Sequence, residues 1–392
     1  MSTEPSTRSD AVPPGPVVVL ACDKFKGSLS AVQVSKALEA GILEVWPGAE
    51  IRAVPVADGG DGTLAAAVAA GFTLEALTAT GPTGSPVATH YAHRDGTALI
   101  EMASVSGLAL LPGDRPAPLT ATSRGTGEVV ASALRSGFRD IVLGIGGSAS
   151  TDGGAGLVRA LGAEVLDADG EPVGDGGLAL TSATRLDVRG LRRMLDGARV
   201  TVACDVDNPL TGPSGAAAVY GPQKGATPEQ IVTLDHGLAT WADLVAGEIG
   251  VDLRDRPGAG AAGGVGFAAI ALLGAEMRPG IDFLLDLVGY DAQLDGAALV
   301  VTGEGSLDEQ TLSGKAAAGV ARRASGAGVP SVAVCGRNEL DATQEASMGV
   351  ADVFALADLE PDADRSMTNA AALLTKVGRR IAETHLTDGR PD

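Results

Sequence analysis

Acidic residues and glycines stand together at a point where an apolar run ends. The run IRAVPV at residues 51–56 is followed by ADGGDGT at 57–63, which contains Asp58 and Asp61, and then by the helix-like stretch LAAAVAAG. Glycine lets backbone amides approach a ligand closely, and a helix N-terminus favours an anion. Two such acids also suit Mg²⁺, which prefers one or two carboxylates together with substrate phosphates. The alternative is that each acid only caps its helix.

Lysine is scarce in this chain, and four of the six lysines lie in glycine-containing loops of a similar kind. Lys24 and Lys26 belong to DKFKGS, Lys224 to GPQKGA and Lys315 to LSGKAA. A lysine ammonium is a compact point charge that suits phosphate or carboxylate oxygens. We expect Lys26 and Lys315 in particular to bind an anion, with solvated surface lysines as the alternative.

The loops follow strand-like runs that alternate with helix-like runs. Near-continuous apolar strands between helices predict parallel sheets covered on both faces, while short β-like runs and turn signals in residues 78–123 predict a mixed sheet there. Ligands of an open parallel sheet bind beyond the carboxyl ends of its strands. The predicted strands cover 17–22, 51–56, 140–146, 198–204, 297–303 and 329–336, and predicted helices cover 30–46 and 313–326.

Five loops should therefore meet at the carboxyl ends of the strands. All five are rich in glycine, Ser or Thr, and Asp, and they cover residues 23–30, 57–63, 144–154, 205–212 and 302–315. We expect their acids to converge at one sheet edge; these acids are Asp58, Asp61, Asp205, Glu304 and Asp308. The histidines lie outside these loops, so a carboxylate fits the role of a general base better than a histidine does.

Composition narrows the classes of partner. The 392 residues carry a formal charge of −20, which argues against nucleic acid and anionic membrane as binding partners.

Three further segments bear on location. The stretch 258–275 has only about ten solidly apolar residues, roughly half a membrane span, so a glycine loop that leads into a buried helix is the better interpretation. Residues 1–15 are polar and Pro-rich and predict a disordered tail rather than a signal peptide. Cys22, Cys204 and Cys335 lie far apart in apolar runs and predict buried free thiols in a reducing cytoplasm.

Two stretches of the sequence resemble familiar nucleotide-binding motifs, and one of the two is incomplete. The stretch LSGKAA ends like a P-loop, but Ala316 follows the lysine where Ser or Thr is required. The stretch GIGGSA at 144–149 satisfies G-x-G-x-x-A after a strand, with Asp167 about twenty residues further on, which is the dinucleotide fingerprint. An NAD-dependent oxidoreductase is therefore one alternative. A non-catalytic anion-binding protein is another.

Taken together, the loops resemble those of the bacterial glycerate kinase family. The resemblance implies ATP-dependent phosphorylation of D-glycerate with Mg²⁺. It also implies a Rossmann-like parallel-sheet domain from residues 16–77 and 296–392, and an inserted α/β domain with a mixed sheet from 78–295. The matching stretches, in order, are KGSLSA (26–31), PVADGGDGT (55–63), TSRGTGE (122–128), GIGGSASTDGGAG (144–156), ACDVDNPLTGPSGAA (203–217), GPQKGA (221–226), GAGAAGGVGFA (258–268) and TGEGSLDEQTLSGK (302–315).

The resemblance also suggests roles for individual residues. We expect Asp205 to be the general base, with Asp308 as the alternative, and Asp58 and Asp61 to hold Mg²⁺, although Asp61 stands where the family usually has Glu. Lys26, Ser28 and Lys315 would bind the glycerate carboxylate or the transferring phosphoryl group, and Lys24, commonly Ser in the family, leaves open which lysine contacts the substrate. The other expected substrate- or phosphate-binding residues are Gly59, Gly60, Gly146, Gly147, Ser148, Lys224, Gly303 and Glu304.

Several properties remain open at this stage. The family phosphorylates either hydroxyl of glycerate, and 2-phosphoglycerate is favoured here from the closeness of the motifs. The partners expected are small molecules only, D-glycerate and ATP, with homo-oligomerisation left open.

Overall fold

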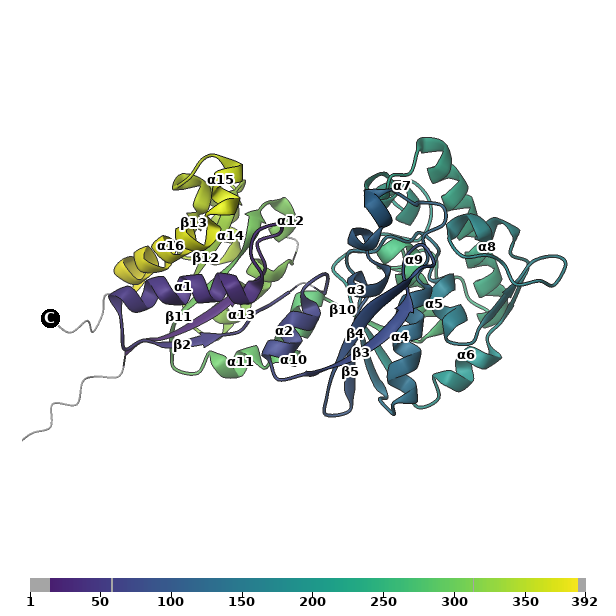
Figure 1. The fold of residues 1–392 in the computed structure, drawn as a ribbon, viewed down its shortest axis with the longest axis horizontal. Coiled ribbons are helices and arrows are strands. Elements are labelled where there is room, and N and C mark those ends of the chain that lie inside the picture. The colour runs from purple at the N-terminus through teal and green to yellow at the C-terminus, as the bar shows by residue number, and fades with distance from the viewer. Residues whose placement is uncertain (1–14, 58, 313, 387–392) are drawn as a thin grey trace, which may run out of the picture. The chain divides into compact units, whose positions relative to one another are not determined.

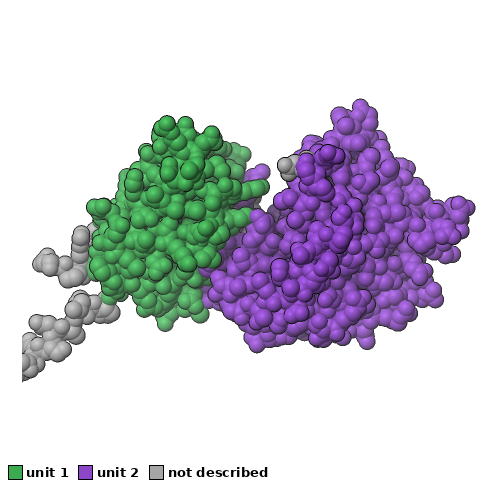
Figure 2. All heavy atoms as spheres, in the orientation of Figure 1, with its two compact units in different colours: residues 1–54, 291–309, 320–392 green, residues 55–290, 310–319 purple. Residues whose placement is uncertain are grey.

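The computed structural model describes residues 15–57, 59–312 and 314–386, which form helices and strands in two compact units (Figure 1). Unit 1 contains both ends of the chain and unit 2 contains its middle (Figure 2). Unit 1 comprises residues 1–54, 291–309 and 320–392, and unit 2 comprises residues 55–290 and 310–319. Each unit holds a β-sheet covered by helices, so the predicted α/β fold class is confirmed.

Unit 1 is built on a fully parallel sheet. Within its described residues the strand order is β13-β12-β11-β1-β2. Val18 and Leu20 pack into the core beneath the helices, while Val19 points to the opposite face and is also buried, which explains the continuous apolar run. The strands are β1 Val17–Cys22, β2 Glu50–Ala53, β11 Ala297–Leu307, β12 Ser331–Asn338 and β13 Val353–Ala355.

Helices α1 and α16 lie side by side on one face of this sheet (Figure 1). Helix α1 begins after Ser30, whose hydroxyl accepts a hydrogen bond from the Gln33 backbone N–H while the Gln33 side chain accepts one from Ser30. A Cβ atom on Gly41 would lie 1.9 Å from the Thr375 carbonyl oxygen, so glycine permits the close helix contact. The helices assigned wholly or partly to unit 1 are α1 Ala31–Val45, α11 Tyr290–Gln293, α12 Glu309–Leu312, α13 Ala316–Gly326, α14 Ala342–Met348, α15 Ala363–Thr368 and α16 Ala370–His385.

Unit 2 is built on a mixed sheet, as residues 78–123 predict. Within the described residues its strand order is β10-β9-β6-β5-β4-β3. The pairs from β10 to β5 are parallel, whereas β4 pairs antiparallel with both β5 and β3. The strands are β3 Thr73–Thr80, β4 Pro86–Arg94, β5 Thr97–Glu101, β6 Asp140–Gly144, β9 Arg199–Ala203 and β10 Glu276–Arg278. A separate two-stranded antiparallel sheet consists of β7 Glu164–Leu166 and β8 Arg185–Asp187.

The chain enters unit 2 at Pro55, whereas the expected first domain ran to residue 77. The difference has a physical reason, because β3 pairs with β4 along its whole length and Ala67 and Phe72 pack against Leu99 and Val142 of the mixed sheet. The helices of unit 2 are α2 Thr63–Ala69, α3 Ala103–Ser106, α4 Arg124–Arg135, α5 Ala155–Ala160, α6 Arg189–Met194, α7 Ala216–Tyr220, α8 Pro228–Ile249, α9 Ala261–Leu272 and α10 Gly280–Val288.

The stretch 258–275 forms a glycine turn followed by a buried helix, as predicted. Gly263 and Gly264 at the start of α9 have positive φ, and Val265 and Phe267 lie in the core of unit 2. No helix among the described residues is long and apolar enough to cross a membrane. Cys22 and Cys335 are buried free thiols, and Cys204 is a half-buried one.

Candidate active site

Two of the predicted loops, the turn before α2 and the loop after β6, meet in unit 2 through backbone contacts between glycines. The Gly146 N–H donates a 3.4 Å hydrogen bond to the Gly59 carbonyl oxygen. A Cβ atom on Gly146 would lie 2.5 Å from Gly60 Cα, and one on Gly144 would lie 2.5 Å from the Gly59 oxygen. Gly59 also has a φ of +88°, and its Cβ would lie 3.1 Å from Ala203 Cβ. The turn before α2, the loop after β6 and the end of β9 therefore pack against one another.

A buried glutamate supports the turn before α2. Glu101, the last residue of β5, is only 5% exposed, and its Oε2 accepts hydrogen bonds from the Gly62 and Leu64 N–H groups at 3.2 and 3.0 Å. These N–H groups at the start of α2 are thus satisfied from within the protein. Asp61 lies exposed in the same turn, while Asp58 lies outside the described residues. Sequence reasoning missed Glu101, whose one signal was an acid at the end of an apolar strand.

Asp205 follows β9 at the edge of these three segments. Its side chain is exposed, and Oδ1 accepts a 2.8 Å hydrogen bond from the N–H of Gly280, the first residue of α10. A carboxylate in this position interacts favourably with the positive end of the helix dipole. The bond fixes the direction of the carboxylate, as a general base requires.

Lys315 is attached to unit 2 through the same helix. It is half-buried and directly precedes α13, whose Gly319 packs so closely on Ile281 of α10 that a Cβ would lie 2.7 Å from Ile281 Cγ1. Asp205 and the segment that carries Lys315 therefore both contact the first turn of α10. The signals that predicted the two residues were separate, and α10 is the element that connects them.

The loop after β6 is held by buried polar groups. Gly147 is exposed with a φ of +73°, whereas Ser148 is only 8% exposed. The Lys224 ammonium, on a side chain 3% exposed, donates hydrogen bonds to Ser148 Oγ at 2.9 Å and to the Ser150 carbonyl oxygen at 2.5 Å. Burial lowers the pKa of Lys224 to about 8, and the negative charge of Asp152 partly opposes this shift.

Asp152 supports the next part of the same loop. It is 1% exposed and accepts hydrogen bonds from the N–H and the hydroxyl of Ser123, both at 2.8 Å, and from the N–H groups of Gly154 and Gly156. Burial raises the pKa of Asp152, and these hydrogen bonds work in the opposite direction. Asp152 was absent from the expected site, since an acid within a Ser, Thr and Gly loop does not reveal from sequence that it points inward.

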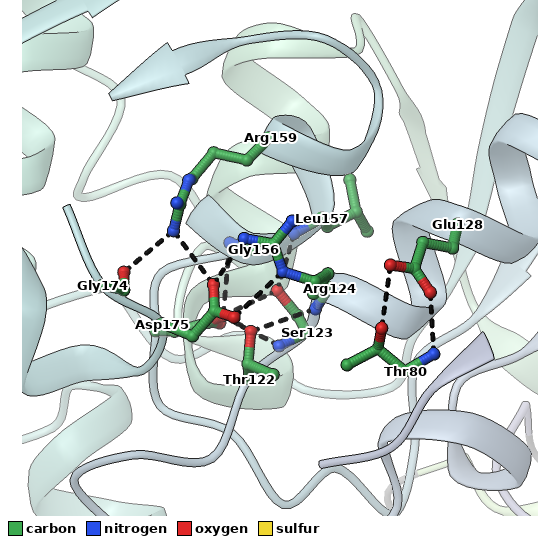
Figure 3. Close-up of polar contacts among 11 residues, drawn as sticks. Thr80, Thr122, Ser123, Arg124, Glu128, Gly156, Leu157, Arg159, Gly174 and Asp175 are labelled. Atoms are coloured by element: carbon green, nitrogen blue, oxygen red, sulfur yellow. Dashed lines mark hydrogen bonds and ion pairs between the residues drawn. The ribbon is translucent and has the colours of Figure 1, made fainter. Parts of the chain in front are cut away.

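The residues that follow Ser123, at the start of α4, make a second set of polar contacts on partly exposed side chains. Figure 3 shows Arg124 and Arg159 pointing at the same carboxylate, that of Asp175, with distances of 2.8 and 2.9 Å. On the next turn of α4, Glu128 accepts hydrogen bonds from the backbone N–H and the hydroxyl of Thr80 (Figure 3). The conspicuous stretch TSRGTGE thus ties α4 to its neighbours.

The remaining predicted residues lie in unit 1, in the loop after β1 and in or just after β11. Because β11 continues to Leu307, Gly303 and Glu304 are strand residues and not part of the loop expected at 302–315. Glu304 and Asp308 belong to the sheet of unit 1 and Asp205 follows a strand of the unit 2 sheet, so the expectation that the acids converge at one sheet edge is wrong. Cys22 of β1 is paired with Gly303 of β11, and a Cβ atom on Gly303 would lie 2.0 Å from the Val334 carbonyl oxygen. The loop after β1 passes close to β11, since a Cβ on Gly305 would lie 3.3 Å from the backbone nitrogen of Lys26.

The side chains of this unit 1 group differ in exposure. Lys26 is exposed and Glu304 and Asp308 are half-buried. The Ser28 hydroxyl donates a 2.7 Å hydrogen bond to the Met367 carbonyl oxygen. Lys24 lies 3.8 Å from Asp23 in an ion pair. That the unit 1 and unit 2 groups share one crevice stays a prediction.

The expected Mg²⁺ has no ready-made cage in the parts of the chain that the structure describes, where no three His, Cys, Asp or Glu side chains gather closely enough to hold a metal. Mg²⁺ commonly takes only one or two protein carboxylates and completes its shell with water and substrate phosphates. An exposed carboxylate such as Asp61 fits that mode of binding.

Comparison with known proteins connects this chain to one family. The glycerate kinase family model matches residues 18–386. A glycerate kinase from Bacillus subtilis is 43% identical, covering 93% of this chain and 96% of the relative, and a glycerate 2-kinase from Escherichia coli is 42% identical, covering 94% and 97%. The crystal structure of a candidate glycerate kinase 2 from Salmonella typhimurium superimposes with a TM-score of 0.82 at 42% identity, covering 94% of this chain and 98% of the other.

The glycine contacts predict the effect of one added methyl group. We expect Gly146→Ala to lower the free energy of unfolding by about 1–3 kcal/mol, because its Cβ would force the loop away from Gly60. Gly247→Ala is the matched control: it lies exposed on α8 with open space around it, and alanine there should be neutral or stabilising by up to about 1 kcal/mol. Urea denaturation measures both variants. Equal midpoints for wild type and Gly146→Ala would contradict the close contact of the loops.

Proposed function

The chain belongs to the glycerate kinase family, and on that premise we propose that it transfers the γ-phosphoryl group of ATP to a hydroxyl of D-glycerate, with 2-phosphoglycerate as the favoured product. The observation that carries the proposal is that the turn before α2 and the loop after β6 meet beside the end of β9, which Asp205 follows in unit 2. Phosphoryl transfer needs mainly positioning and charge neutralisation. The backbone amides and the oriented carboxylate serve the positioning, and cations must supply the neutralisation.

We assign the phosphates of ATP to the loop after β6, with Gly146, Gly147 and Ser148 as the contacting residues and Gly59 and Gly60 beside them. The accessibility of Gly146 and Gly147 supports the assignment, because a phosphate can approach a backbone that carries no side chains. Gly59 and Gly60 are buried and pack against this loop from within. The loop was also the basis of the NAD alternative. The matches to glycerate kinases over almost the whole chain do not favour that alternative.

Asp205 is proposed as the general base that takes the proton of the glycerate hydroxyl late in the transfer. The hydrogen bond from Gly280 supports this role, since it orients the carboxylate at an exposed position. Asp308, a half-buried residue of unit 1, remains the alternative.

Anionic groups need cations in a chain of charge −20, and we propose Lys26 and Lys315 for the glycerate carboxylate or the transferring phosphoryl group. Ser28, Gly303 and Glu304 complete the proposed contacts. Because the Ser28 hydroxyl donates its proton to Met367, its oxygen is best suited to accept a hydrogen bond from a substrate hydroxyl.

Mg²⁺, when bound with ATP, neutralises charge on the phosphates. Asp58 and Asp61 are the residues that we propose to hold it. The Asp61 side chain is one methylene shorter than the Glu that is usual in the family, so it suits a metal that remains largely hydrated. A cytoplasmic location agrees with the reduced cysteines and is part of the proposal.

The activity itself is tested by ADP release. We expect the protein to release ADP from Mg·ATP when D-glycerate is added and to show only background release without it, because the acceptor hydroxyl is the substrate. Several small hydroxy acids serve as controls, and ³¹P NMR of the product identifies the phosphorylated hydroxyl. Release that is independent of every acceptor would contradict the proposal. Retention on NAD rather than ATP affinity medium would favour the oxidoreductase.

The role of Asp205 is tested by Asp205→Asn. The amide oxygen can still accept the hydrogen bond from Gly280, so the variant should keep its shape and its KM for glycerate, while kcat falls by about 10²–10⁴ because the proton acceptor is lost. Asp196→Asn is the control, since Asp196 is an exposed acid that precedes β9, at the opposite end of the strand from Asp205. A kcat of Asp205→Asn within threefold of wild type would exclude Asp205 as the base and direct attention to Asp308.

A further inference from the structure

Lys224 is a buried cation directly beneath the loop after β6. It ends the short turn Pro222–Lys224, which lies between α7 and α8, and it is 3% exposed. Its ammonium donates to Ser148 Oγ at 2.9 Å and to the Ser150 carbonyl oxygen at 2.5 Å. Both acceptors belong to the loop that begins with Gly146. The side chain thus acts from inside the protein, although the sequence suggested a direct contact with substrate.

A lysine in this position is unfavourable for stability alone. Lysine is rarely buried fully, because an ammonium loses its hydration there. The lowered pKa of Lys224 reflects that cost. The nearest compensating charge is Asp152, which is itself buried and is bonded to Ser123, Gly154 and Gly156 rather than to the lysine. Well-packed apolar residues can replace buried ions with no loss of stability in many proteins. The position therefore calls for a functional explanation.

The segment that Lys224 holds is also fixed by backbone contacts. The Leu108 N–H donates to the Gly147 carbonyl oxygen and the Ala149 N–H donates to the Ser106 carbonyl oxygen, both at 2.9 Å, on either side of Ser148. Further along, Gly153 is fixed by its N–H, which donates to the Gly263 carbonyl oxygen, and by its carbonyl oxygen, which accepts a bond from Trp241 Nε1. Among the described residues, Lys224 is the side chain that hydrogen-bonds to Ser148, next to the exposed Gly147.

Two neighbouring hydroxyls show that this segment is not optimised for folding. Ser150 Oγ and Thr151 Oγ1 are fully buried, and among the described residues they have no hydrogen-bond partner. A buried polar group without a partner costs about 1–3 kcal/mol of stability. Unfavourable groups of this kind cluster where function constrains the structure.

We propose that Lys224 is a positioning residue: its two hydrogen bonds hold residues 146–150 in the shape that binds the phosphates of the nucleotide, and it does not touch the substrate. This inference rests on the proposed function, in which that loop binds ATP. The stretch GPQKGA, which contains Lys224, therefore supports the loop after β6. The charge of Lys224 acts on the nucleotide only through the loop.

A pair of variants separates this role from simple packing. Methionine and glutamine have similar size and shape, but glutamine retains a hydrogen-bond donor and methionine has none. For Lys224→Met we expect kcat/KM for ATP to fall by about 10²-fold, the scale expected when a binding group is misplaced. For Lys224→Gln we expect a loss about tenfold smaller. Stability should follow the opposite order, since methionine suits a buried site better than an amide does.

The readouts are KM and kcat for each substrate, urea midpoints, and amide hydrogen exchange of residues 146–150. We expect the KM for ATP to rise, the KM for D-glycerate to stay within threefold of wild type, and exchange to quicken in Lys224→Met. Lys376→Met, an exposed lysine on α16, controls for the loss of one positive charge and should match wild type.

The results that would overturn the inference are specific. A Lys224→Met variant with normal KM for ATP and normal exchange, or activities that follow the order of the urea midpoints, would reduce Lys224 to a packing residue. If Lys224→Met does not fold, Lys224→Gln with normal KM and exchange overturns it equally. Failure of the proposed function gives a different result, because wild type would then release no ADP with D-glycerate. Hydrogen exchange of the loop would still report whether Lys224 holds it.

Discussion

The close approach of two backbones, with no room for a side chain between them, is the constraint on which the site depends. Gly59 and Gly60 lie against Gly144 and Gly146 at distances where any Cβ atom would collide with main-chain atoms. This contact joins a turn before a helix to a loop after a central strand of the mixed sheet. It buries Gly59 and Gly60 and leaves the backbone at Gly146 and Gly147 accessible, which is what a phosphate-binding surface requires. Glycine is needed at these positions because of how the two loops meet.

Two buried charged side chains hold the loop after β6 in place from inside the protein. Lys224 and Asp152 carry opposite charges, each is almost fully buried, and each is bonded to a different part of the loop after β6. Such groups are costly unless their hydrogen bonds are well made. Here they replace the side-chain packing that the glycines cannot provide, so the loop is rigid without being bulky. Glu101 does the same for the turn before α2.

The sequence predicted what local rules determine, and missed what depends on direction in three dimensions. Alternation of apolar strands with helices was sufficient for the parallel sheet, and the helix predicted over residues 30–46 matches α1. The residues that bear the expected chemistry were visible because they interrupt apolar runs. Whether Lys224 faces a ligand or the core could not be read from its neighbours in sequence, because burial comes from residues 148 and 150, more than seventy positions away. Glu101 and Asp152 were missed for the same reason.

The central claim is that the turn at 59–63, the loop at 144–150 and the segment at 203–207 together form one ligand surface in unit 2. Hydrogen–deuterium exchange of the full chain, with and without a non-hydrolysable ATP analogue, Mg²⁺ and D-glycerate, tests it most directly. We expect the three segments to become protected together when the ligands are present. Exchange that is unchanged in all three, or protection of one while the other two exchange as before, would contradict it.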